Sequence, residues 1–170
     1  GILVFWPFVR FELRQKDPAI DIRVFAQPNM WPVQLTAFLI GISILGAQAP
    51  LSTYAGTDKA ELGYGLGLAS GSISILIGLY LVSMIVGALL FPLISRLFTP
   101  RITLIIAAFF VAVGYLLFLP LHLETWQVFM NMGLAGLGIG ALVGAMPAAA
   151  AAAAPRGQTG IASALTNTTK

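Results

Sequence analysis

The residues best suited to chemistry in this chain are polar side chains set inside long apolar runs. An amide or hydroxyl in apolar surroundings needs a hydrogen-bond partner or water. Such a side chain therefore either bonds to a neighbouring helix or lines a water-filled cavity, and for the glutamines we leave both interpretations open. The candidate cavity residues are Gln34, Ser43, Gln48, Tyr54 and Asn131.

The sequence contains no pattern typical of catalysis or metal binding. The chain has no cysteine, and no Asp, Glu, Lys, Arg or His lies in the middle of a complete apolar run. The spacing of the remaining residues matches no metal-ligand cluster, nucleophile triad or phosphate loop. We therefore expect no enzyme activity, no catalytic residue, no cofactor and no metal site. His122 follows an apolar run, and we expect it to be solvated in a loop.

The composition indicates which solvent surrounds these residues. Only 9% of residues are charged, 58% are hydrophobic, and the mean hydropathy is +0.93. Soluble domains are about a quarter charged, so this chain cannot cover itself with a water-facing surface. A lipid bilayer is the expected surrounding, with a soluble, very apolar helical bundle as the weaker alternative. The net charge of +3 does not indicate a nucleic-acid partner, because the basic residues lie between the apolar runs.

Long uncharged runs predict an all-α, polytopic transmembrane helix bundle. About 20 apolar residues cross a hydrocarbon core of about 30 Å. The runs predict four complete spans, at about 32–54, 67–95, 102–120 and 127–154. Gly63, Gly65 and Gly67 predict a re-entrant or loop-like start to the second run. The flanking parts predict two truncated spans and a linker, with residues 1–9 ending a preceding transmembrane helix, 10–31 forming a cytoplasmic linker and 157–170 starting a further helix.

Basic residues are distributed unevenly between the predicted loops. Only Lys59 falls on one side of the predicted spans. Basic residues in short loops mark the cytoplasmic side, so the linker 10–31, the turn 96–101 and the C-terminal end are expected there. The eight residues on that side are Arg10, Arg14, Lys16, Arg23, Arg96, Arg101, Arg156 and Lys170.

Small residues distinguish the last complete span from the third. Gly136, Gly140 and Gly144 recur every four residues on one helix face, and such a stripe lets another backbone approach closely. The stripe is either a static packing seam or a face that slides during a conformational change. Pro147 predicts a kink, because it removes one helix hydrogen bond. The run 102–119 has few polar residues, and we expect it to face lipid or at least to lie at the periphery of the bundle.

Several segments, in this order, resemble the C-terminal part of a major facilitator superfamily transporter. The likeness is to the fourteen-span drug:proton antiporter branch. It rests on Pro18-Ala-Ile-Asp21-Ile-Arg23, Gly63-Tyr64-Gly65-Leu66-Gly67, Gly136-Leu-Gly138-Ile-Gly140 with Met146-Pro147, and Gly160-Ile-Ala-Ser163. The turn 96–101 keeps Arg96 and Arg101 but lacks the acid and glycine often found there in the family.

The resemblance implies a fragment of a secondary transporter in the cell membrane. It implies proton-coupled efflux of small lipophilic molecules by alternating access, with the substrate, protons, the lipid bilayer, the N-terminal half and the last two spans as partners. The candidate cavity residues would then line the substrate path. An importer of sugars or metabolites on the same fold, or a non-transporting membrane interaction or sensory protein, remain the alternatives.

Overall fold

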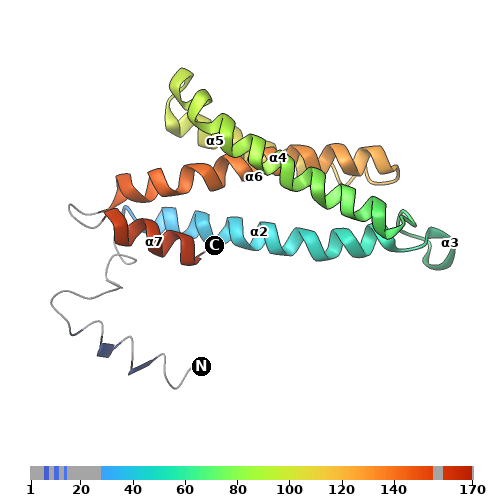
Figure 1. Cartoon of the computed structure of the whole chain (residues 1–170), viewed down its shortest axis with the longest axis horizontal. Helices are drawn as coiled ribbons and strands as arrows, with labels where there is room; N and C mark the ends of the chain where they lie inside the picture. Colours follow the sequence, from blue (N-terminus) through green and yellow to red (C-terminus); the bar gives the residue numbers. More distant parts are fainter. Residues whose placement is uncertain (1–5, 8–9, 12–13, 15–27, 155–158, 170) are drawn as a thin grey trace. The chain divides into compact units, whose positions relative to one another are not determined.

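A computed structural model describes residues 6–7, 10–11, 14, 28–154 and 159–169, with the backbone alone at 100, 101 and 165. Most of the predicted helix end 1–9 and most of the linker 10–31 lie outside the described residues. Every regular element in the described part is helical (Figure 1), and the predicted all-α class is confirmed.

Three of the described helices are long and apolar enough to cross a membrane. They are α2 (Trp31–Gly56), α4 (Ser70–Leu97) and α6 (Thr125–Ala153). Two shorter elements are α3 (Lys59–Leu62) and α7 (Thr159–Thr169). The three long helices fall on predicted apolar runs, because a run without charges satisfies its backbone internally only as a helix.

The third predicted span, 102–120, corresponds to the shorter helix α5 (Pro100–Leu116). Its start is defined by Thr99, whose side chain accepts a hydrogen bond from the Ile102 amide at 3.4 Å, and by Pro100 in the first turn. Its end comes earlier than predicted, and residues 117–120 form a turn. Pro120 disfavours helical geometry in the residue before it. At 17 residues, α5 is about 26 Å long, and a complete crossing by it stays a prediction.

The second predicted span begins at Ser70 instead of residue 67, because three glycines precede it with positive φ. These angles are 77° at Gly63, 104° at Gly65 and 59° at Gly67, and a right-handed helix cannot contain them. The loop then folds back onto the end of α2. The amides of Leu66, Gly67 and Leu68 donate to the carbonyls of Tyr54, Thr57 and Ala55 at 3.3, 2.8 and 2.8 Å. Carbonyls at the end of α2 that lack helical partners are thereby satisfied.

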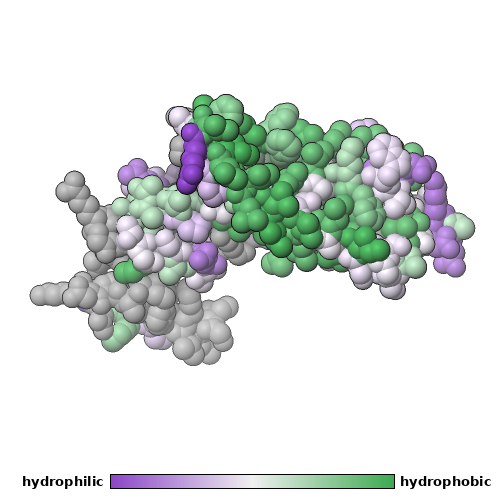
Figure 2. Space-filling model, turned by 45° about the horizontal axis from the view of Figure 1, so that its top comes forward, coloured by the Kyte–Doolittle hydropathy of each residue, from purple (hydrophilic) through white to green (hydrophobic). Residues whose placement is uncertain are grey.

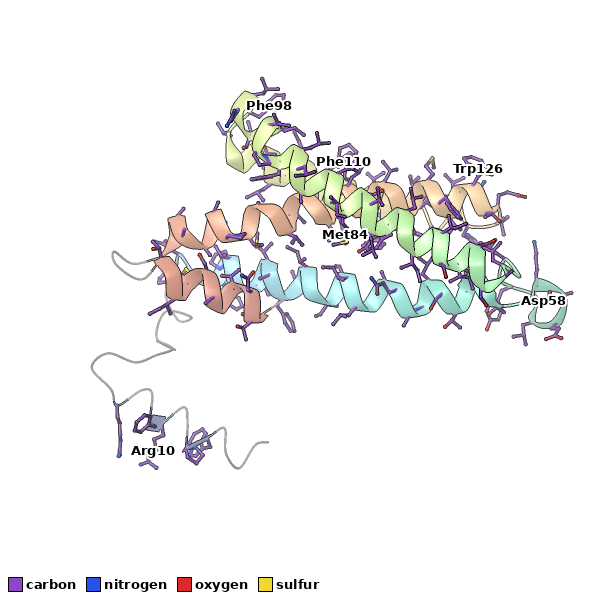
Figure 3. All side chains as sticks on the ribbon, in the orientation of Figure 1. Arg10, Asp58, Met84, Phe98, Phe110 and Trp126 are labelled. Carbon is purple, nitrogen blue, oxygen red and sulfur yellow. The ribbon has the colours of Figure 1, made fainter. Side chains whose placement is uncertain are left out.

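The chain forms two compact units, residues 42–145 and residues 1–41 with 146–170. In the first unit, α6 packs against α4 through its glycine stripe. A methyl group at Gly136 would lie 2.7 Å from the Tyr80 carbonyl oxygen, and one at Gly140 would collide with the Met84 carbonyl. A methyl group at Gly144 would lie 3.2 Å from the Ala88 backbone, so this contact is looser. Figure 3 labels Met84 on α4, where this helix passes α6.

The opposite face of α6 packs equally closely against α5. A methyl group at Gly138 would lie 2.5 Å from the Ala107 carbonyl, and one at Gly114 of α5 would lie 2.6 Å from the Ala135 amide nitrogen. Only one face of α5 is packed in this way, so contact of its other faces with lipid stays a prediction. Thr103 and Ala107 are buried, whereas Phe109 on another face is 65% exposed.

The outer surface of this unit is apolar. Hydrophobic residues cover most of the visible face in Figure 2, and hydrophilic residues gather at the end that carries α3. Exposed side chains of α4 include Ile85 and Leu89, at 60% and 67%. An apolar surface of this kind is stable only in lipid or against another apolar surface, which agrees with the bilayer expected from composition.

The second unit is held by a polar contact between α2 and α7. The side-chain amide of Gln34 donates to Thr166 Oγ1 at 3.2 Å, and Thr169 Oγ1 donates to Gln34 Oε1 at 2.8 Å. Both ends of the amide are therefore used between helices. Met30 and Ala162 are fully buried beside them.

We predict that Gly140→Ala lowers the thermal stability of the protein, because the added methyl group collides with the Met84 backbone. Overpacking of this kind costs about 1–3 kcal/mol. Gly78→Ala in α4 is the matched control, since a methyl group there meets nothing within 4 Å, and the melting temperature should be unchanged or higher. Melting of the purified protein in detergent, followed by size-exclusion chromatography, measures both. Equal effects of the two substitutions would contradict the close packing.

Candidate substrate cavity

A cavity of about 400 Å³ lies within the unit 42–145 and is partly open to the outside. It is lined by the second half of α2, the end of α5 with the turn that follows, and α6. Most of its wall is apolar. The lining residues are Ala47, Pro50, Leu51, Tyr54, Tyr115, Phe118, Leu119, His122 and Met132.

Tyr54 and His122 connect α2 to the chain segment between α5 and α6. The Tyr54 hydroxyl donates to the His122 carbonyl oxygen at 2.7 Å. The two rings contact each other edge to face, with centroids 6.1 Å apart and an interplanar angle of 63°, an arrangement that aromatic pairs prefer. The Tyr54 ring thereby holds the segment after α5 against the end of α2.

Tyr115 makes a second connection to α2. Its hydroxyl donates to the Ser43 carbonyl oxygen at 3.3 Å, a longer and weaker bond than that of Tyr54. Gly114 packs closely on α6, and this contact positions the neighbouring Tyr115 relative to α6. The cavity therefore carries two phenol groups, each bonded to a backbone carbonyl.

The structure brings only part of the predicted cavity set together. Tyr54 lines the cavity. Ser43 is not a lining residue, and its backbone carbonyl accepts the hydrogen bond from Tyr115. Gln48 is partly buried and is not a lining residue. Asn131 is fully buried, and its Nδ2 donates to the Leu121 carbonyl at 2.7 Å. Its Oδ1 has no hydrogen-bond partner in the described part of the chain. Gln34 belongs to the other unit and forms the interhelical bond that the sequence left open.

The prolines inside helices and the arginines of the turn 96–101 have different surroundings. Pro147 lies inside α6, and its carbonyl accepts a hydrogen bond from Ser163 Oγ of α7 at 3.4 Å. Pro50 is a second proline, inside α2, on the cavity wall. Arg96 is exposed in the last turn of α4. The side chain of Arg101 is not among those that the structure describes, so a role of Arg96 and Arg101 at the turn stays a prediction.

The prediction that His122 is simply solvated is wrong. The residue is partly buried and lines the cavity, and its Nδ1 is buried without a hydrogen-bond partner among the described residues. Sequence reasoning also missed Tyr115 and Phe118. Pro120 was the available signal, because a proline at the end of an apolar run predicts a turn there, and Tyr115 and Phe118 lie next to that turn.

Metal binding has no support in the described residues, which contain no group of three or more His, Cys, Asp or Glu side chains that could hold an ion. The walls of the cavity can bury apolar surface, and their phenol and imidazole groups can form hydrogen bonds.

We predict that Tyr54→Phe loosens the segment 117–124, because it removes the bond to the His122 carbonyl. Such a bond contributes about 1 kcal/mol, so amide hydrogen exchange in this segment should speed up by about fivefold. Mass spectrometry of the purified protein measures the rate. Tyr64→Phe is the matched control, since Tyr64 is exposed in the loop after α3. Unchanged exchange in Tyr54→Phe would contradict the assigned role.

Comparison with known families identifies the chain. The model of the Major Facilitator Superfamily matches residues 4–170, nearly the whole sequence. Neither the search of curated proteins nor the search of solved structures gave a match. The family match agrees with the long apolar helices and the closely packed glycines. This chain belongs to the Major Facilitator Superfamily of membrane transporters.

Proposed function

We propose that the chain is the C-terminal part of a secondary transporter that exports small lipophilic molecules in exchange for protons. Transport would follow alternating access, in which helix bundles rock around a central binding site. Family membership supports a transporter. The finer assignment to drug:proton antiport rests on the motif resemblance and on the cavity.

The cavity is the observation that carries this proposal. Its volume of about 400 Å³ lies in the range of about 300–1,000 Å³ typical of small-molecule sites. A sugar would need a polar partner for most of its hydroxyl groups, since a buried, unpaired hydroxyl is costly. This wall has three polar side chains, Tyr54, Tyr115 and His122. A lipophilic substrate fits it better than a sugar or a polar metabolite.

Proton coupling needs an ionisable group in the membrane. The middle of α2, α4 and α6 contains no Asp, Glu, Lys, Arg or His. We therefore place the proton-carrying residues in another part of the transporter. The chain would contribute to the cavity and to the moving helices, with Gly136, Gly140, Gly144 and Pro147 as the positions where α6 slides or bends.

A membrane interaction or sensory protein is the second candidate. Such a protein needs no cavity, so occupation of the cavity by a transported molecule separates the two functions. Direction of movement separates an exporter from an importer on the same fold.

We predict that Ala47→Trp abolishes export, because the indole ring fills the cavity. Ala49→Trp on the same helix is the matched control, since Ala49 is exposed and is not a lining residue. Proteoliposomes containing the full-length protein, with a lipophilic fluorescent dye and an imposed pH gradient, measure the rate. We expect dye movement in the unmodified protein and in Ala49→Trp, and a reduction of at least about tenfold in Ala47→Trp.

Two results of this assay would overturn the proposed function. No dye movement under any pH gradient would rule out proton-coupled export. Dye movement only toward the cytoplasmic side would favour an importer. Normal export by Ala47→Trp would show that the cavity is not on the substrate path.

We also propose that the turn 96–101 is cytoplasmic and that the loop carrying α3 is external, because eight of the nine basic residues fall on one side of the predicted spans. Residues 1–170 contain no cysteine, so single introduced cysteines report the orientation in a background without other cysteines. In intact cells an impermeant maleimide should label Glu61→Cys and not Arg96→Cys. The reverse pattern would contradict the orientation.

A further inference from the structure

Both phenol groups of the cavity wall act as donors in hydrogen bonds within the protein. Tyr54 donates to the His122 carbonyl at 2.7 Å, and Tyr115 donates to the Ser43 carbonyl at 3.3 Å. A carbonyl oxygen carries no hydrogen, so chemistry alone assigns the tyrosine as donor in both bonds. Each phenol has one O–H hydrogen. With that hydrogen used, each phenol oxygen can offer a ligand only its lone pairs. The buried Tyr80 hydroxyl lies beside Tyr115 and can occupy one of its two lone pairs, which leaves the other for a ligand.

The rest of the wall supplies little to balance these acceptors. Pro50 has no amide hydrogen, and the other lining side chains apart from His122 are hydrocarbon, thioether or phenyl groups: Ala47, Leu51, Phe118, Leu119 and Met132. The neutral imidazole of His122 carries one donor and one acceptor, so it favours neither kind of ligand. The polar wall is therefore richer in acceptors than in donors.

We propose that the cavity selects lipophilic molecules that carry an O–H or N–H donor over molecules of the same shape that can only accept hydrogen bonds. This inference rests on the proposed function and names the substrate class for the same site. A donor on the ligand pairs with a phenol oxygen while the apolar body fills the cavity. An acceptor-only ligand of the same shape leaves the phenol oxygens desolvated and unpaired, which costs binding free energy.

Tyr115 is the specificity-determining residue in this scheme. Its hydroxyl bonds to a backbone carbonyl of α2 and takes no part in the contact that holds the segment after α5. Removing its hydroxyl leaves the hydrogen bond between Tyr54 and His122 in place. Tyr115→Phe therefore removes one acceptor from the wall and keeps the aromatic surface.

A matched ligand pair tests the proposal without any transport. Naphthol has an O–H donor, and its methyl ether has the same ring system without one. Binding of each to the full-length protein in detergent, without a pH gradient, is followed by naphthalene fluorescence, and detergent alone corrects for partition. We expect the unmodified protein to bind naphthol about tenfold more tightly than the ether. Tyr115→Phe should bring that ratio to about two or less, and Tyr64→Phe in the exposed loop should leave it unchanged.

Each opposite result overturns the proposal. It fails if the ether binds as tightly as naphthol, if neither ligand binds, or if Tyr115→Phe and Tyr64→Phe change the ratio equally. Should Tyr115→Phe elute as an aggregate, the ratio measured on the unmodified protein decides alone. A donor preference in a protein that moves no dye along a pH gradient would overturn the proposed function and keep this inference. Export that does not depend on a donor in the exported molecule would overturn this inference and keep the proposed function.

Discussion

The contact between the backbones of α6 and its two neighbours is the constraint on which the unit 42–145 depends. Helices in lipid associate without a strong hydrophobic driving force, so they rely on close van der Waals packing. Gly136 and Gly140 allow this packing toward α4, and Gly138 allows it toward α5. Because α6 is fixed on two faces, the residues at its start have little freedom. The position of Met132 on the cavity wall follows from that packing.

Hydrogen bonding decides the character of the cavity more than its size does. In apolar surroundings each polar group must find a partner within the protein. Tyr54 and Tyr115 meet this requirement by bonding to backbone carbonyls of other segments. The same bonds join α2 to α5 and to the segment after α5. A single set of interactions therefore closes the wall of the cavity and determines what its polar groups can offer a ligand.

The sequence predicted the helical elements well and their ends less well. Uncharged runs identify α2, α4 and α6, because only a helix satisfies its own backbone in lipid. The ends depend on local backbone chemistry that hydropathy ignores. Helix α5 ends early, at Leu116, in the turn that leads to Pro120, and the positive φ angles of Gly63, Gly65 and Gly67 delay the start of α4. Both signals are present in the sequence, and both matter more than the length of the apolar run.

By itself, the sequence determined the class of protein, the membrane surroundings and the face of α6 with recurring glycines. These properties follow from composition and from a helical period of 3.6 residues, and both are local. Only the tertiary structure decided which polar side chains meet. Gln34 and Tyr54 lie on the same helix, yet one pairs with Thr166 and the other reaches His122. Such partners are more than 60 residues apart in sequence, so their pairing depends on how helices pack, which no local pattern records.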